Sequence, residues 1–114
     1  MSNCIFCKIA KKEIPANVIA ETENLVAFRD ITPQAPVHFL IIPKKHIPTL
    51  NDISSGDANI IFEAFLLAKD LAKKEGISED GYRVVVNTNA GAGQSVFHIH
   101  WHVLGGRKFS WPPG

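Results

Sequence analysis

The sequence predicts an α+β fold, in which a five-stranded antiparallel sheet carries a short N-terminal helix and one long helix packed on it. Five short segments rich in β-branched and aromatic residues are bounded by turn residues, as strands usually are. One longer segment instead has apolar residues three and four apart, as an amphipathic helix does. The length of 114 residues suits one domain, residues 1–114, with a single core.

The chain begins with a predicted short helix over residues 5–12, which ends before Pro15. Residues 17–21 and 25–28 follow as two short strands. A polar turn of three residues joins them, and such a short connection indicates an antiparallel hairpin.

Residues 37–42 form the predicted central strand, because nearly every side chain in this segment is apolar. His38 interrupts the run. It is either a hydrogen-bonded core residue or a partner that orients a catalytic imidazole. The preceding loop begins at Asp30 and contains two prolines. Asp30 either stabilises this turn or accepts hydrogen bonds from ribose hydroxyls, and the residues alone favour the turn.

The long helix is expected to begin at residues 54–57, a Ser-Ser-Gly-Asp signal, and to end near Lys74. The residues predicted on its buried face are Ile61, Ala64, Phe65, Ala68, Leu71 and Ala72. We assign this helix a packing role and no chemistry.

A predicted strand over residues 82–87 leads into a glycine-rich loop, residues 89–95. A strand follows this loop, whereas a dinucleotide fingerprint or a P-loop would open a helix. Small residues still let backbone N–H groups approach a phosphate, so the loop is a candidate anion cradle with Ser95 at its mouth.

The most informative pattern lies in residues 94–104, where His98, His100 and His102 alternate with apolar residues. Strict alternation predicts the last strand, and side chains two apart share one face of a strand. Three of the five histidines therefore point the same way. The Cα atoms of the first and third lie roughly 13 Å apart on a straight strand, so one metal ion could bind all three only if the strand bends.

Three interpretations of this row are open. The histidines could be partly buried residues satisfied by backbone partners, although a buried polar row is costly unless each member is paired. A His-x-His pair could bind zinc in a metal hydrolase. One histidine could be a nucleophile flanked by histidines that bind phosphate, which is the interpretation we prefer.

Cys4 and Cys7 form a Cys-x-x-Cys pair near the N-terminus. A redox motif usually follows a strand, a disulfide is disfavoured in a reducing cytosol, and half of a zinc site needs further ligands. His46 follows the central strand and, with one histidine of the row, could complete a Cys₂His₂ site. The spacing alone leaves these alternatives open.

Composition excludes several functional classes. Lys and Arg number 12 against 11 Asp and Glu, so the net charge of +1 gives no reason to expect nucleic acid or acidic membranes as partners. No apolar segment approaches the roughly 20 residues that span a bilayer, and the N-terminus has no signal-peptide core. We expect a cytoplasmic protein. Trp111 near the C-terminus predicts a tail that docks, on a second subunit for example.

The pattern His-apolar-His-apolar-His-apolar-apolar at residues 98–104 resembles the motif that names the histidine-triad (HIT) superfamily of nucleotide hydrolases and transferases. Residues 28–36, 42–47, 93–95 and the closing Trp-Pro-Pro-Gly resemble its Hint branch. The similarity covers nearly the whole chain.

This resemblance implies a HIT-like fold and a hydrolase that cleaves the P–N bond of a purine nucleoside 5′-phosphoramidate, such as adenosine 5′-phosphoramidate or an adenylated lysine. His100 would be the nucleophile, His102 would contact the phosphate oxygens, Ser95 would help to protonate the departing amine, and His38 would support the triad. Residues implied to bind the nucleotide are Phe6, Ile9, Phe28, Asp30, Ile31, Asn87, Gln94 and Trp111.

The resemblance also implies a structural zinc ion, held by Cys4, Cys7, His46 and His98, and a homodimer in which Trp111 reaches toward the partner's active site. Its purine nucleotide substrate would be an AMP or GMP derivative. Alternative functions are a dinucleoside polyphosphate hydrolase, a zinc-dependent hydrolase with metal on His98 and His100, and a nucleotide-binding interaction module.

Overall fold

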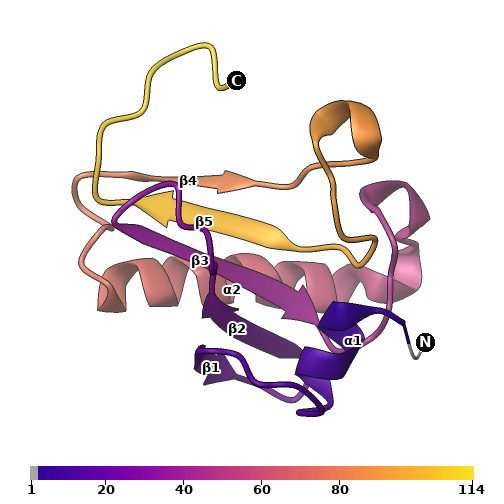
Figure 1. The fold of residues 1–114 in the computed structure, drawn as a ribbon. Helices are drawn as coiled ribbons and strands as arrows, with labels where there is room; N and C mark the ends of the chain where they lie inside the picture. Colours follow the sequence, from indigo (N-terminus) through magenta and orange to yellow (C-terminus); the bar gives the residue numbers. More distant parts are fainter. Residues whose placement is uncertain (1–2) are drawn as a thin grey trace.

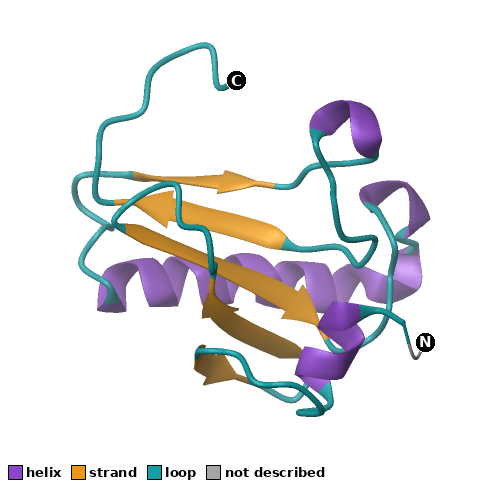
Figure 2. Cartoon of the chain, viewed as in Figure 1, coloured by secondary structure: helices purple, strands orange, loops and turns teal. Residues whose placement is uncertain are grey.

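The computed structural model describes residues 3–114 and contains one five-stranded antiparallel sheet with two helices (Figures 1 and 2). The helices and strands, in chain order, are α1 (Ile5–Ala10), β1 (Val18–Glu21), β2 (Leu25–Arg29), β3 (Val37–Pro43), α2 (Ala58–Lys74), β4 (Tyr82–Val85) and β5 (Trp101–Gly105). Short 3₁₀ helices are η1 (Leu50–Asp52), η2 (Ser55–Asp57) and η3 (Ala90–Ala92). The predicted α+β fold is confirmed.

The strand order is β1-β2-β3-β5-β4, so the last strand lies between β3 and β4. In the β3–β5 register, His38 is opposite Leu104 and Leu40 is opposite His102. Residues directly opposite in an antiparallel pair project to the same face of the sheet. The register therefore brings His38 and His102, distant in sequence, to one face.

The two faces of the sheet have different coverings (Figure 1). Helix α2 packs on one face, where Ala64 and Ala68 lie in a core with Phe39, Ile41 and Trp101. The small alanine side chains on the contact side of the helix leave room for the large side chains of the sheet, which fill the space between helix and sheet.

The opposite face carries α1. Phe6 and Ile9 of this helix pack with Val26 and Phe28 of β2 and with Leu40 of β3. His38 and His102 project from this face, since they share it with Leu40. The short helix covers only part of the face, which leaves room for a cavity beside it.

The final strand is shorter than predicted, because β5 begins at Trp101 and not near residue 94. Trp101 pairs with Ile41, and β3 ends two residues later at Pro43, which has no N–H for a ladder. The chain before Trp101 instead bonds to the next loop, with Ile99 N–H donating to Ile47 C=O at 2.6 Å. His98 and His100 therefore precede the strand, and the straight row inferred from alternation is wrong.

Helix α2 also differs in detail. It begins at Ala58, because Ser55–Asp57 form a 3₁₀ turn in which the Asp57 carboxylate accepts from the Ser54 N–H at 3.0 Å. Phe65, predicted on the buried face, is half exposed, whereas Ala64, Ala68, Leu71 and Ala72 are buried as expected. The apolar stripe of the helix is wider than the sheet surface beneath it. Within residues 3–114, no helix has the length and apolar content needed to cross a bilayer.

Candidate active site

A cavity of about 450 Å³ opens beside α1 on the face that carries His102. Its apolar wall includes Phe6, Ile9 and Phe28, with the Phe6 and Phe28 rings edge to face at 5.5 Å between centroids. Its polar side groups are contributed by Asp30, Asn87, Ser95, His100 and His102, among others. An apolar slot next to a cluster of polar groups suits a molecule with an aromatic end and a charged end.

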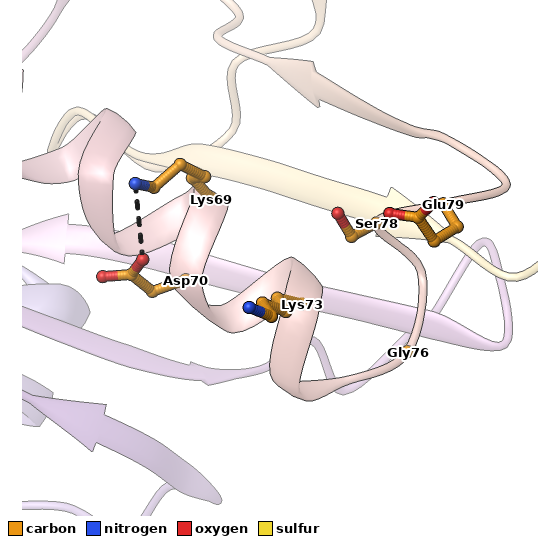
Figure 3. A pocket seen from close by; sticks show the side chains of 6 residues that line it. All are labelled: Lys69, Asp70, Lys73, Gly76, Ser78 and Glu79. Atoms are coloured by element: carbon orange, nitrogen blue, oxygen red, sulfur yellow. Dashed lines mark ion pairs between the residues drawn. The ribbon is translucent and has the colours of Figure 1, made fainter.

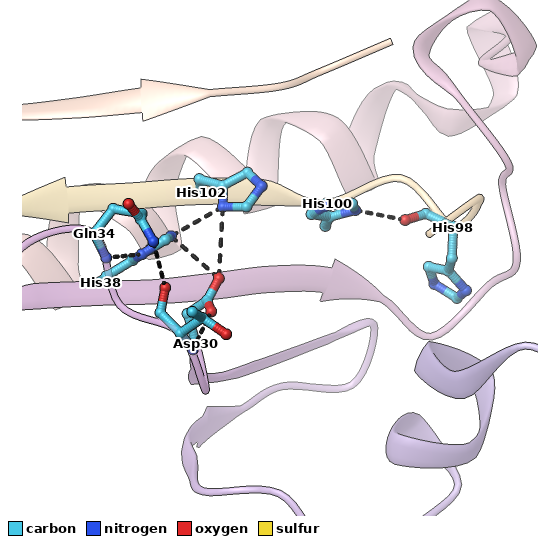
Figure 4. A network of polar contacts seen from close by, with 7 residues as sticks. Asp30, Gln34, His38, His98, His100 and His102 are labelled. Atoms are coloured by element: carbon cyan, nitrogen blue, oxygen red, sulfur yellow. Dashed lines mark hydrogen bonds and ion pairs between the residues drawn. The ribbon is translucent and has the colours of Figure 1, made fainter. Parts of the chain in front are cut away.

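His100 is buried at the polar end, and its Nδ1 lies 2.8 Å from the carbonyl oxygen of His98 (Figure 4). A carbonyl can only accept, so Nδ1 carries the hydrogen and donates it. Nε2 then keeps its lone pair. Burial lowers the pKa of His100, so the neutral form persists near neutral pH. This imidazole is therefore prepared to act as a nucleophile through Nε2.

His98 points to the other end of the row, toward α1. Its Nε2 donates to the Pro43 carbonyl at 2.7 Å, which leaves the Nδ1 lone pair directed at Cys4, Cys7 and His46. Nδ1 lies 3.4 Å from Cys4 Sγ, 3.5 Å from Cys7 Sγ and 3.2 Å from His46 Nδ1. Burial lowers the pKa of His98 to about 4, so its ring is neutral.

These four side chains fit a tetrahedral metal site. Ligand atoms around zinc lie about 3.4–3.8 Å apart when Zn–N is near 2.1 Å and Zn–S near 2.3 Å. The Cys₂His₂ set has the donors that zinc prefers, and the carbonyl on the far nitrogen of His98 fixes the tautomer that a ligand needs. The chain thus brings together all four residues that the sequence predicted as metal ligands.

His102 contacts a different group of residues. Its Nδ1 lies 2.9 Å from Nε2 of His38, which is buried, and Asp30 Oδ2 lies 3.3 Å from the same His38 nitrogen. Burial lowers the pKa of His102 to about 4. The other Asp30 oxygen accepts from the Thr32 N–H at 2.8 Å, which is the turn that the residues alone favoured. His38 thus contacts His102 directly, and the proposed ribose contact of Asp30 stays a prediction.

The glycine-rich loop ends at the cavity, where Gly93 and Ser95 form part of the wall. Gly93 has φ of 88°, which favours glycine. Gln94 is buried, and its carboxamide bonds to the backbone of Asn89, Pro48 and Val96. Gln94 therefore holds the loop, while its predicted contact with the phosphate is untested.

Besides Gln94, which does not line the cavity, two other predicted nucleotide-binding residues lie at its edge or beyond it. Ile31 lines the cavity but is 98% exposed, and Trp111 is 82% exposed in the C-terminal tail. Sequence reasoning missed Ile14, Asn17 and Leu40, which also line the cavity. Leu40 could have been predicted from the sequence, because it lies two residues after His38 and therefore on the same face of the strand. Ile14 and Asn17 lie in a loop that has no such pattern.

A second hollow, of about 510 Å³, lies at the C-terminal end of α2 (Figure 3). Two lysines, two acidic residues, Gly76 and Ser78 line it. Lys69 and Asp70 pair with each other at 3.7 Å, and both are well exposed. The charges balance on a solvated surface, so this hollow has neither the apolar wall nor the buried polar groups of the first cavity.

Known proteins resemble the chain over most of its length. The HIT domain family matches residues 11–109. Purine nucleoside phosphoramidase of Escherichia coli is 50% identical over 103 residues, which are 90% of this chain and 87% of that protein. An uncharacterised HIT-like protein of Synechocystis is 49% identical, with 96% of each chain covered.

Solved structures agree with this relationship. A HIT family hydrolase from Legionella pneumophila superposes with a TM-score of 0.97 and 59% identity, covering 98% of this chain and 100% of that one. The family match, the curated relatives and the superposition all include the segment that carries the three histidines. On this ground the chain belongs to the HIT domain family.

Proposed function

We propose that the protein hydrolyses purine nucleoside 5′-phosphoramidates, such as adenosine 5′-phosphoramidate or an adenylated lysine, through a nucleotidyl-His100 intermediate. One observation carries the proposal: the His98 carbonyl holds the hydrogen of His100 on Nδ1, which leaves a lone pair on Nε2. Similarity to the E. coli enzyme named purine nucleoside phosphoramidase supports the substrate class.

The proposed reaction has two displacements. In the first, His100 Nε2 attacks the 5′-phosphorus, a P–Nε2 bond forms, and the P–N bond to the amine breaks. The departing amine takes a proton, for which Ser95 at the cavity wall is the proposed donor. In the second, water attacks the phosphorus, the P–Nε2 bond breaks, the proton that water loses restores the Ser95 hydroxyl, and a nucleoside monophosphate leaves. Two inversions at phosphorus predict net retention of configuration.

The cavity suits the rest of the substrate. The purine would lie between the aromatic and aliphatic side chains of α1 and β2, Phe6 and Phe28 among them, where stacking is favourable. Asp30 would accept from the ribose hydroxyls at the cavity edge. The phosphate would then lie by His100 and His102, with the backbone of the Gly93–Ser95 loop at its other side.

The test is hydrolysis of adenosine 5′-phosphoramidate by the wild type and His100→Ala. We expect turnover to fall by about 10⁴-fold or more, as when a covalent nucleophile is removed, while nucleotide binding survives. Turnover retained in His100→Ala would rule out the intermediate. Faster hydrolysis of a dinucleoside polyphosphate than of the phosphoramidate would favour that alternative substrate class.

We also propose that the Cys4, Cys7, His46 and His98 site holds zinc in a structural role. Four protein ligands leave no open position for substrate, so the ion would tie α1 to the segment before β5. Chelation that stopped catalysis without changing stability or the fold would instead favour a catalytic metal.

A homodimer is the assembly we propose. Phe62, Phe65 and Leu66 on the outer side of α2 are 64%, 51% and 39% exposed, and β4 is an edge strand. An exposed apolar helix face and an open strand edge are both surfaces that a second copy of the chain can cover. Trp111 would then meet the partner. Sedimentation should show a dimer in the wild type. Phe62→Glu should dissociate this dimer, and Lys69→Ala, an exposed control on the same helix, should leave it intact.

A cytoplasmic location stays a prediction.

A further inference from the structure

His38, His102 and Asp30 form a second cluster of potential metal ligands at the cavity (Figure 4). Two imidazoles and one carboxylate are a familiar set for a divalent cation. A neutral imidazole has one N–H and one lone pair, and only the lone pair binds metal. The hydrogen-bond partners of His38 therefore decide whether the cluster accepts a cation.

The backbone N–H of Gln34 donates to Nδ1 of His38, with 3.0 Å between the two nitrogens. An amide N–H can only donate, so Nδ1 of His38 must hold the lone pair. The single hydrogen of the neutral ring is then on Nε2. This is the nitrogen that faces His102 and Asp30, and its hydrogen stands where a cation would have to bind.

The same assignment fixes His102. Its Nδ1 lies 2.9 Å from Nε2 of His38, a separation that accommodates one hydrogen between the two nitrogens. Since His38 supplies that hydrogen, Nδ1 of His102 accepts and its own hydrogen is on Nε2. Asp30 Oδ2 is 3.9 Å from His102 Nδ1, too far to accept a hydrogen bond from it.

We propose that the backbone amide of Gln34 is a positioning group that, through His38, holds His102 in the Nε2–H tautomer. The neutral ring then offers a fixed hydrogen-bond donor to a phosphoryl oxygen and cannot serve as a base at Nε2. This assignment rests on the proposed function for the identity of the acceptor. It rests on the hydrogen-bond chain alone for the tautomer.

The C-terminal tail anchors this amide. Arg107 Nε donates to the Gln34 carbonyl at 2.9 Å, and its guanidinium lies over the Phe109 ring at 4.3 Å. Gly106 packs so closely on Pro36 that an added Cβ would lie 2.9 Å from Pro36 Cβ. The tail therefore contacts the loop that carries the amide of Gln34 through both a hydrogen bond and close packing.

Long-range ¹H–¹⁵N correlation of ¹⁵N-histidine protein, without substrate, measures which ring nitrogen carries each hydrogen. In the wild type we expect Nε2–H for His38 and His102 and Nδ1–H for His100. An Nδ1–H on His102 would overturn the proposal, whatever the activity of the protein. The expected tautomers in a protein that does not cleave phosphoramidates would contradict the proposed function and leave the hydrogen-bond chain supported.

Gln34→Pro removes the N–H, and Gln34→Ala is its matched control because it keeps the amide. We expect mixed tautomers of His38 and His102 in the proline variant and wild-type tautomers in the alanine variant. The kcat of Gln34→Pro should fall about 10-fold or more with little change in KM, since the donor acts most strongly on charge that develops in the transition state. Unchanged tautomers and kcat in folded Gln34→Pro would overturn the proposal.

Arg107→Ala is a milder variant that keeps the backbone N–H of Gln34 but removes the hydrogen bond from the tail to the Gln34 carbonyl. We expect a roughly twofold to fivefold lower kcat, as for loss of one exposed hydrogen bond, and exchange-broadened histidine signals. Lys108→Ala, next in the tail, should match the wild type. Sharp wild-type spectra and full kcat in Arg107→Ala would contradict the anchoring role of the tail.

Discussion

His100 and His102 are two residues apart, and their rings are 4.9 Å apart between centroids. Burial lowers the pKa of both. The partners of Nδ1 nevertheless differ: a backbone carbonyl for His100, and the Nε2–H of His38 for His102. A carbonyl demands a donor and an N–H demands an acceptor, so the two rings take opposite tautomers.

The comparison shows how one residue type can serve two roles in the same cavity. His100 would offer a lone pair, which attacks phosphorus, and His102 would offer an N–H, which stabilises the charge on the phosphoryl oxygens. Neither role needs a protonated imidazole. Each is set by a backbone group, the His98 carbonyl in one case and the Gln34 amide in the other.

Replacing each histidine with glutamine tests this division most directly. His100→Gln has no nucleophilic nitrogen, so kcat should fall about 10⁴-fold or more. In His102→Gln the side-chain NH₂ reaches toward the position of Nε2–H, so kcat should fall only about 10- to 100-fold. Steady-state kinetics on adenosine 5′-phosphoramidate measures both. Equal losses of kcat in the two variants would contradict the division of roles between His100 and His102.

Metal removal should affect the His100 side of the row and spare the tautomer of His102. Cys7→Ala loses a ligand, and the free energy of unfolding should fall by about 4 kcal/mol if zinc is present at 1,000 times its Kd. The peptide of His98 that accepts from His100 would also loosen. Zinc content, thermal unfolding and the ¹⁵N spectrum are the measurements, and His102→Gln is the control that should retain zinc. Full stability without zinc would contradict a structural role.

Asp30→Asn separates substrate binding from support of the histidine pair. If the carboxylate accepts from ribose, KM should rise about tenfold, as for one lost charge-assisted hydrogen bond, with kcat nearly unchanged. A 2′,3′-dideoxy substrate should show the same KM with the wild type and with the variant. A lower kcat with unchanged KM would indicate instead that Asp30 acts through the pair of histidines it contacts.

Stability at acidic pH tests whether His102 is neutral in the fold. The pKa of His102 is about 4 in the fold, lowered first by burial and then by His100 and His38, against 6.5 ordinarily, while Asp30 opposes the shift. The unfolded chain binds the proton more readily between these values, so the free energy of unfolding falls as pH drops from 6.5 to 4. His102→Gln removes this contribution, so between pH 7 and pH 5 the free energy of unfolding of the variant should fall by about 2 kcal/mol less than that of the wild type. Denaturant unfolding across this range measures it, and parallel curves would contradict the assignment.

Much of the fold and site is readable from the sequence. Five strands, two helices and the hairpin follow from local periodicity and turn residues, which act over a few neighbours. The four metal ligands and the wall residues Phe6 and Phe28 are recoverable because the motifs that resemble the HIT family are specific. The alternating pattern wrongly predicted a strand at His98 and His100. Because β3 ends at Pro43, the segment before Trp101 has no strand of the sheet to pair with.

The residue types that would carry the chemistry can be read from the sequence: three alternating histidines, two cysteines and Asp30 at the start of a loop. The tertiary structure alone decided which nitrogen of each ring carries the hydrogen. That choice depends on the carbonyl of His98 and the amide of Gln34, and every residue has these groups. The pattern of side chains in a sequence therefore cannot predict which backbone groups contact the imidazoles. Only the register of β3 against β5 and the path of the loop before β3 bring them to the imidazoles.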